Sequence, residues 1–244
     1  MMFKDRFHIP EYEYDERVFV DYVNRQYTDS LASIKKKMDA IIPPKLSREA
    51  EILADDTLNK YWDGEYPVDS SRIVHDMGIA AYVGDTPGDA TGLILKKAGS
   101  EKPIISVKGD VSTSRQRIAF AYAAGYYIGC VNGAGGTEYD PEESFGLRYY
   151  SIDSDEFILR DRISSGLELP GRNTLEMFAD RFALSLLMPR HELKSFSDAG
   201  VNTLMTVWAF DVSETALLNR LHWLESDSLT TNRQPSEFFR NLLK

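Results

Sequence analysis

The residues that could carry metal or acid–base chemistry are few and widely spaced. The four histidines stand at positions 8, 75, 191 and 222, so none lies three or four residues from another. A helix that binds zinc through two histidines usually places them four residues apart, where both imidazoles reach one metal ion. A metal site would therefore need ligands from distant segments. No Ser-His-Asp or Cys-His arrangement indicates a catalytic nucleophile either.

A glycine-rich stretch at 132–136 could be taken for a phosphate-binding turn. It lacks the G-x-G-x-x-G order and a following Lys-Ser/Thr pair, so we interpret it as a loop. It opens a long segment, 132–171, whose part 138–156 is acidic and carries three tyrosines. We interpret 138–156 as a solvated loop, with a recognition surface for a basic partner as the alternative.

The stretch 114–130 predicts the helix around which the rest of the chain is organised. Positions 118, 121, 122, 125 and 126 form one face of apolar and small residues with i, i+3, i+4 spacing. Such a face predicts a helix that is buried on both sides or packed very tightly. Gly125 would allow the close approach of a neighbour, and Arg115 and Arg117 form a basic turn at the helix start.

This helix resembles the active-site helix of the ImmA/IrrE family of zinc metallopeptidases. The family's helix begins with Arg-Gln-Arg-Phe and carries a His-Glu-x-Gly-His type zinc motif a few residues later. When the chain is aligned on 115–117 and on Gly125, the two histidine positions fall on Tyr122 and Tyr126. The position of the family's catalytic glutamate falls on Ala123.

A second stretch is similar to a later helix of the same family, which reads Glu-Ala-Asn-x-Phe-Ala and then Leu-Leu-Met-Pro. The match runs over 179–189, but Phe178 occupies the place of the glutamate that is the family's third zinc ligand. Glu176 lies two residues earlier, about 200° around the helix, and cannot simply substitute for that ligand. Asp180 matches a position that the family fills with Asn or Asp, and we interpret it as structural.

The residues at these four positions cannot perform the family's chemistry. Zinc lowers the pKa of its bound water from about 15.7 to about 7, and the family's glutamate then takes the proton. Tyrosine has a pKa near 10, so two phenolates would have to form side by side, and Ala123 has no basic group. We therefore assign no catalytic residue and no metal ligand, and we expect no zinc cofactor. We interpret Tyr122 and Tyr126 as packed aromatic residues.

Composition indicates an ordinary globular protein. Of the 244 residues, 43% are hydrophobic and 27% are charged, and the formal net charge of −10 argues against a broad nucleic-acid surface. The single cysteine, Cys130, excludes an intramolecular disulfide framework, suits a reducing compartment and is expected to be buried. Residues 1–14 lack a signal-peptide pattern, and the apolar run 118–131 is shorter than the ~20 residues that span a bilayer. We expect a cytoplasmic protein without membrane contact.

We predict an α+β fold with a zincin-like metallopeptidase core, in which a small sheet accompanies the active-site helix. We divide the chain into an N-terminal helical segment (1–63), a zincin-like pseudo-peptidase domain (64–190), a C-terminal helical unit that resembles a helix-turn-helix (191–225) and a tail (226–244). Apolar periodicity predicts N-terminal helices at 15–40 and 47–62.

Within the pseudo-peptidase domain Asp69 or Ser70 is expected to cap a helix that runs through His75 and Met77, and Gly78 is expected to end it as a C′ residue. Strands are predicted at 79–83, 92–96, 103–107 and 157–159. In the C-terminal unit, Ser213 is a good N-cap for a helix whose Ala216 and Leu217 face inward. A polar linker is predicted at 227–234.

The resemblance implies a regulatory protein. Family members are cytoplasmic proteases or anti-repressors, often encoded by phages and mobile elements, that act on a helix-turn-helix repressor. Our leading hypothesis is a catalytically inactive pseudo-metallopeptidase that binds a protein partner, such as a repressor or transcription factor. Its partner-binding cleft would contain Tyr122, Tyr126, Phe178 and Arg117.

Two alternatives remain open at this point. The first is an active metallopeptidase or anti-repressor with a displaced metal site. The second is a DNA-binding transcriptional regulator that uses residues 198–225, whose second helix offers Asn219, Arg220 and His222 but no basic cluster.

Overall fold

The structure is a computed structural model that describes residues 44–86, 90–96, 100–134, 148–150 and 174–230. All of these residues belong to one compact unit, 40–244. The helices predicted at 15–40, the strand predicted at 157–159 and most of the acidic stretch 138–156 lie outside the described residues.

The described residues form an α+β fold, as the sequence predicts. In chain order the elements are α2 (Pro44–Tyr61), α3 (Ser70–Asp76), β1 (Ala80–Gly84), β2 (Gly92–Leu95), β3 (Ile104–Lys108), α4 (Thr113–Val131), β4 (Arg148–Tyr150), α6 (Thr174–Leu187), α7 (Arg190–Asp198), α8 (Thr203–Phe210) and α9 (Glu214–Thr230). The strands predicted at 79–83, 92–96 and 103–107 are thus confirmed to within one residue at each end.

The four described strands form one mixed sheet in the order β1-β3-β2-β4. Strand β1 runs parallel to β3, while β2 is antiparallel to both β3 and β4. Ile94 and Ile105 are opposite each other in the register of β2 and β3, and both side chains are buried. Strand β1 forms one end of the described sheet, and most of its side chains are exposed.

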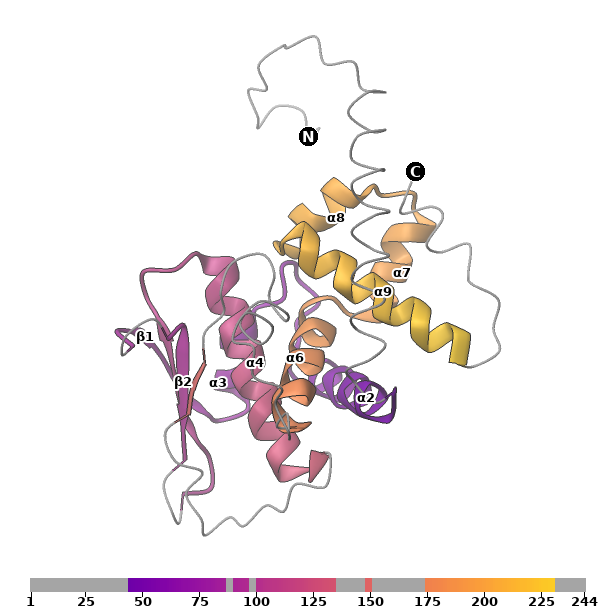
Figure 1. Cartoon of the computed structure of the whole chain (residues 1–244). Helices are drawn as coiled ribbons and strands as arrows, with labels where there is room; N and C mark the ends of the chain where they lie inside the picture. Colours follow the sequence, from indigo (N-terminus) through magenta and orange to yellow (C-terminus); the bar gives the residue numbers. More distant parts are fainter. Residues whose placement is uncertain (1–43, 87–89, 97–99, 135–147, 151–173, 231–244) are drawn as a thin grey trace, which may run out of the picture. The chain divides into compact units, whose positions relative to one another are not determined.

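Helix α4 is the centre of the fold. It begins after the N-cap Ser112, whose hydroxyl accepts a hydrogen bond from the backbone N–H of Arg115 at 3.4 Å. Every side chain from Ile118 to Tyr126 is buried, because α4 packs on the sheet on one side and on α6 on the other (Figure 1). The prediction that this helix is buried on both sides is confirmed, and the thiol of Cys130 near its end is buried as expected.

Two glycines allow α4 and α6 to approach closely. A Cβ atom added to Gly125 would lie 2.8 Å from Cδ1 of Phe182, and one added to Gly129 would lie 2.7 Å from Cδ1 of Phe178. Real Cβ atoms essentially never approach another heavy atom this closely. The two phenylalanine rings stack on each other with centroids 6.2 Å apart. The predicted role of Gly125 in a close helix contact is confirmed.

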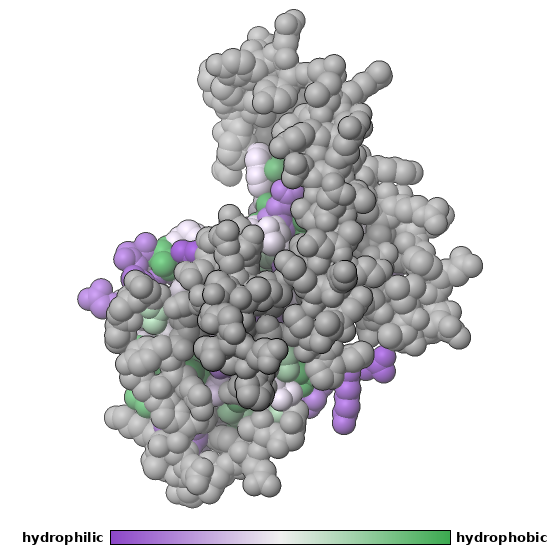
Figure 2. Space-filling model, in the orientation of Figure 1, coloured by the Kyte–Doolittle hydropathy of each residue, from purple (hydrophilic) through white to green (hydrophobic). Residues whose placement is uncertain are grey.

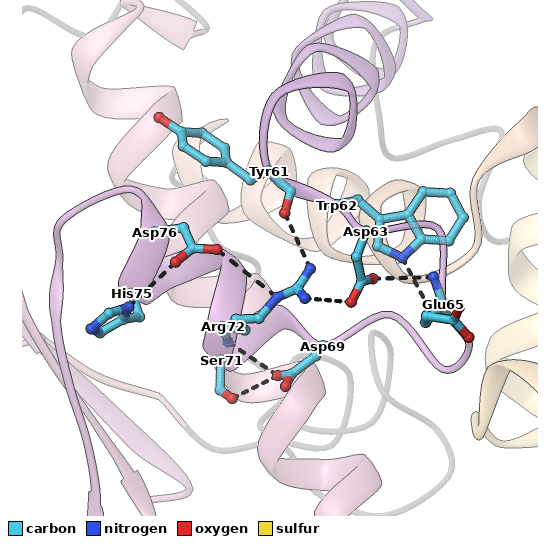
Figure 3. Close-up of polar contacts among 9 residues, drawn as sticks. All are labelled: Tyr61, Trp62, Asp63, Glu65, Asp69, Ser71, Arg72, His75 and Asp76. Atoms are coloured by element: carbon cyan, nitrogen blue, oxygen red, sulfur yellow. Dashed lines mark hydrogen bonds and ion pairs between the residues drawn. The ribbon is translucent and has the colours of Figure 1, made fainter.

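Polar contacts help to hold the connection between α2 and α3 (Figure 3). Asp69 is the N-cap of α3, as predicted, and its carboxylate accepts hydrogen bonds from the backbone N–H of Arg72 at 3.0 Å and from the Ser71 hydroxyl at 2.6 Å. The guanidinium of Arg72 in turn binds the carboxylate of Asp63. Gly78 ends α3 with a φ of +73°, as its predicted C′ role requires.

The C-terminal part is helical, as predicted, and an aromatic cluster joins it to the segment before α3. The ring centroid of Tyr66 lies 5.1 Å from that of Phe210 and 5.6 Å from that of Phe196. The Tyr66 hydroxyl donates a hydrogen bond to the Glu192 carboxylate. Burial, with a further contribution from Glu192, raises the pKa of that hydroxyl above its usual value.

Helix α9 starts as predicted but ends later than predicted. The Ser213 hydroxyl accepts a hydrogen bond from the backbone N–H of Ala216 at 3.1 Å, and Ala216 and Leu217 are buried. The helix then continues to Thr230, so the linker predicted to begin at 227 is wrong for its first four residues. Polarity alone does not stop a helix, and no glycine or proline interrupts 214–230.

Apolar side chains are exposed at several separate places in the described structure. They include Ile52 on α2, Tyr82 and Val83 on β1, and Leu204 and Trp208 on α8. On the face drawn in Figure 2, hydrophilic and hydrophobic described residues lie side by side. Within the described part of the chain, no helix is long and apolar enough to cross a membrane.

We predict that Gly125→Ala destabilises the fold although alanine is the better helix former. In an open helix position the change would stabilise by up to about 1 kcal/mol. Here the added methyl group would displace Phe182, and we expect the free energy of unfolding to fall by about 1–3 kcal/mol, measured by urea denaturation. Gly84→Ala is the control, because its Cβ would meet nothing within 4 Å. A stabilised Gly125→Ala variant would contradict the close contact.

Candidate functional site

The four positions that the resemblance aligns with zinc ligands and a general base all lie in the core. Tyr122, Ala123 and Tyr126 are on α4 and are 8%, 0% and 4% exposed. Phe178 is on α6 and is 0% exposed. The structure brings position 178 against α4 at Gly129, one helical turn beyond Tyr126. The packing of α6 on α4 thus brings together the two segments that would both have to supply ligands to one metal ion.

The side chains at these positions do not fit a zinc ion. They offer two phenol groups, one methyl group and one phenyl ring, whereas zinc in proteins is held by imidazole, thiolate or carboxylate. Among the described residues, no group of three or more His, Cys, Asp or Glu side chains could hold a metal ion. Of the described histidines, the side chains of His75 and His191 are 83% and 60% exposed and belong to different helices. We therefore derive no chemical step through a metal.

Arg117 lies at the start of α4 and binds the end of α8. Its Nη2 atom donates a hydrogen bond to the Asp211 carboxylate at 2.8 Å and to the carbonyl oxygen of Phe210 at 3.2 Å. Its Nη1 atom donates to the carbonyl oxygen of Val68 at 3.4 Å. Burial lowers the pKa of Arg117, while the charges of Asp211 and Asp69 oppose that shift. The guanidinium is thus engaged within the fold.

The contact with Arg117 explains the backbone conformation of Asp211. Asp211 ends α8 in the left-handed region, with a φ of +45°, where residues other than glycine are uncommon. Its carboxylate and its carbonyl oxygen both accept hydrogen bonds from Arg117. A cation at the C-terminus of α8 also interacts favourably with the helix dipole. Arg117 therefore fixes the turn between α8 and α9.

The cleft expected from the sequence consists of residues that are out of reach of a partner in this structure. Phe178 and Tyr126 are buried, and the side chain of Arg117 is 11% exposed and already bound. Phe178 lies against Gly129 of α4, so a partner could touch it only if α4 and α6 moved apart. The expectation that Tyr122 and Tyr126 are packed aromatic residues agrees with their burial.

The second helix of the unit that resembles a helix-turn-helix does not present the polar residues expected for DNA contact. Asn219 and Arg220 are 2% and 1% exposed. Arg220 forms a two-pronged ion pair with the Glu51 carboxylate on α2, with both N–O distances at 2.5 Å, and its Nε atom donates to the carbonyl oxygen of Met188. These two side chains are not available to bases or phosphates.

The ion pair controls the charge state of Glu51. Burial alone would raise the pKa of this carboxyl group, but the charge of Arg220 and hydrogen bonds from Arg220 and Ser185 outweigh that effect. The pKa of Glu51 is therefore lower than its usual value of 4.5. Sequence reasoning missed this pair because Glu51 and Arg220 are 169 residues apart and neither belongs to a recognisable motif.

Comparison with known proteins identifies no family for this chain. A scan against protein-family models finds no match, and a search of curated proteins finds no significant match. The similarity to ImmA/IrrE peptidases thus rests on the two stretches 115–126 and 179–189.

We predict that Arg117→Met destabilises the fold by about 2–4 kcal/mol. The change keeps much of the apolar stem but leaves the buried carbonyl groups of Phe210 and Asp211 without a charged donor. Urea denaturation measures the loss, and hydrogen exchange should show the earliest opening at α8. The control is Arg115→Met, two residues earlier in the first turn of α4, which should change the free energy of unfolding by less than about 0.5 kcal/mol. Equal effects of the two substitutions would refute the special role of Arg117.

We predict that Arg220→Met costs about 3–5 kcal/mol, because it leaves the Glu51 carboxylate buried without its cation. In the double variant Glu51→Gln/Arg220→Met the loss should be clearly smaller than the sum of the two single losses. Urea denaturation of the four proteins completes the cycle. If the loss of unfolding free energy in the double variant equals the sum of the two single losses, Glu51 and Arg220 do not stabilise each other.

The lowered pKa of Glu51 also predicts an acid dependence. A carboxyl group with a lowered pKa in the folded state contributes stability above its unfolded pKa and loses that contribution as the pH falls through its folded pKa. The stability of the unmodified chain should therefore drop below about pH 4.5, and Glu51→Gln should remove part of that drop. The pKa of Asp55 is raised by burial and by Glu51, so it contributes with the opposite sign. An unchanged pH profile in Glu51→Gln would contradict the assignment.

Proposed function

We propose that this protein is a catalytically inactive relative of the ImmA/IrrE metallopeptidases, with a zincin-like core, that regulates a protein partner by binding it. The observation that carries the proposal is the chemistry of positions 122, 123, 126 and 178. They lie on the two helices that resemble the family's ligand-bearing helices, yet all four are buried apolar or aromatic side chains. The partner class proposed is a repressor or transcription factor, as the resemblance implies.

The exposed edge of the sheet supports a mode of partner binding. Strand β1 pairs on one side with β3 and stands at the end of the described sheet. Tyr82 and Val83 on this strand are 59% and 56% exposed. An extended peptide can add to such an edge through backbone hydrogen bonds and gain specificity from alternate side chains. We therefore place the proposed partner contact at β1 rather than at Tyr122, Tyr126, Phe178 and Arg117.

The rival proposals receive less support. An active peptidase with a displaced metal site would need a new group of ligands, and the described residues contain no such group. A DNA-binding regulator would need exposed basic residues on α9, where Arg220 is instead paired with Glu51. We therefore prefer protein binding to both alternatives.

The first test is the zinc content of the natively purified full chain, measured by elemental analysis. We expect less than about a tenth of an equivalent, because phenol, methyl and phenyl groups do not hold zinc. One equivalent of tightly bound zinc, together with chelator-sensitive cleavage of a protein substrate, would contradict the proposal that the protein is an inactive enzyme.

A gain-of-function variant tests the relationship to the zinc family itself. The fourfold change Tyr122→His, Ala123→Glu, Tyr126→His and Phe178→Glu would install the family's ligands and base on α4 and α6. If the two helices have the family's arrangement, the variant should bind about one equivalent of zinc and be stabilised by it against urea. The matched control carries Ala123→Glu alone and should bind none. A folded fourfold variant without zinc affinity would argue against the resemblance.

The edge-strand contact can be tested with peptides selected for binding to the full chain from a random display library. We expect selected peptides to be extended, with alternating apolar residues, and to protect the backbone amides of 80–84 from hydrogen exchange. Val83→Pro should weaken binding at least tenfold, because proline removes a backbone donor and disfavours strand pairing. Ile52→Lys is the control, because it changes an exposed apolar residue on α2, outside β1, and should leave peptide binding unchanged. If the peptide affinity of Val83→Pro equals that of the unmodified chain, the contact does not lie at β1.

A further inference from the structure

We propose that the cavity lined by α2, α6 and α9 binds a short aliphatic carboxylate, such as propionate, through the guanidinium of Arg181. The inference does not depend on the proposed function. The residues on which it rests all line this cavity: Glu51, Arg181, Arg220, Trp223 and Leu224.

The first observation is that Arg181 is buried with hydrogen-bond donors unsatisfied. This residue is 5% exposed, and its Nε and Nη1 atoms have no hydrogen-bond partner among the described residues. Its guanidinium carbon lies 3.1 Å from the ring centroid of Trp223, so the indole covers one face of the group. Burying a charged group whose donors lack acceptors costs free energy, and a ligand with acceptor oxygens in the adjoining cavity would offset that cost.

The charges in and around the cavity favour a ligand with a single negative charge. Glu51 and Arg220 bind each other through a two-pronged ion pair. Asp180 and Glu51 attract the charge of Arg181, but neither accepts a hydrogen bond from its Nε or Nη1 atom. Arg48 also lines the cavity, but it already has an interaction partner, and we assign it no role in binding. A monovalent anion would complete the coordination of Arg181, whereas the two carboxylates would repel a second negative charge.

The size of the cavity limits the ligand to a few heavy atoms. Its volume is about 30 Å³, room for the centres of about two waters. Arg48 is exposed and borders the cavity, so a small ligand can enter from the surface there.

The lining favours a carboxylate with a short alkyl chain over other monovalent anions. A planar carboxylate matches a planar guanidinium through two parallel hydrogen bonds, which a halide ion cannot form. Leu224 and the indole of Trp223 offer apolar surface in the same cavity. A carboxylate at one end and an alkyl group at the other would therefore meet a cation and an apolar wall together.

Isothermal titration of the full chain with sodium propionate tests the proposal, with sodium chloride used to hold the ionic strength constant. We expect one propionate per chain with a dissociation constant of about 1 mM, because so small a ligand makes few contacts. Propionamide has the same shape without the charge and should bind at least about tenfold more weakly. Acetate should bind about fourfold more weakly, because it has one methylene group fewer to place against the apolar wall.

Variants of Arg181 locate the site. Arg181→Met removes the guanidinium and should weaken propionate binding at least about tenfold. The matched control is Arg115→Met, which removes a guanidinium outside the cavity and should leave the affinity unchanged. Arg181→Lys keeps the charge and removes the planar fork, so its affinity should lie between those of Arg181→Met and the unmodified chain. If Arg181→Met does not fold, Arg181→Lys decides, because an unchanged affinity would exclude a role for the guanidinium.

Four results would overturn the proposal. They are the absence of binding heat with propionate up to about 20 mM, equal affinity for propionamide, tighter binding of phosphate than of propionate, and equal affinity in Arg181→Met. The first result is the one expected if only water or chloride occupies the cavity. The comparison of propionate with propionamide uses the unmodified chain, so it does not depend on the folding of any variant.

Discussion

The close contact between α4 and α6 is the constraint on which the rest of the structure depends. It exists because Gly125 and Gly129 leave room for the rings of Phe182 and Phe178. With that contact made, α4 covers the sheet with one side while α6 carries α2 on its other side (Figure 1). Dense packing of this kind tolerates little change in volume, so the spacing of the two helices is set by the sequence of both.

The same contact occupies the space in which a metallopeptidase would need ligands and water. A zinc centre requires polar donors, a second shell that orients them and an open coordination position. Here position 178 presents a phenyl ring to Gly129, and position 123 presents a methyl group that is completely buried. Apolar packing thus fills the space, and this packing is the physical basis for proposing a binding role in place of catalysis.

Periodicity and caps could be predicted from the sequence, whereas pairings between distant charges could not. The close approach at Gly125 and the N-cap at Ser213 follow from local residue types, and the structure has both. The tie from Arg117 to the end of α8 and the pair of Glu51 with Arg220 carry no local pattern, because each joins segments far apart in the chain. The sequence therefore suggests a partner-binding cleft for Arg117 and a DNA contact for Arg220, whereas both side chains bind groups within the fold.

The pair between Glu51 and Arg220 also orders events during synthesis. Helix α2 is made early, yet its buried carboxylate obtains its cation from a residue 169 positions later. Until Arg220 has left the ribosome, packing α2 against α6 would bury an uncompensated negative charge. The first described helix and the last must therefore dock together, and a chain truncated before α9 would hold α2 only loosely. Among the described helices, α9 in this sense closes the fold, and the core around Glu51 can be completed only after Arg220 has been synthesised.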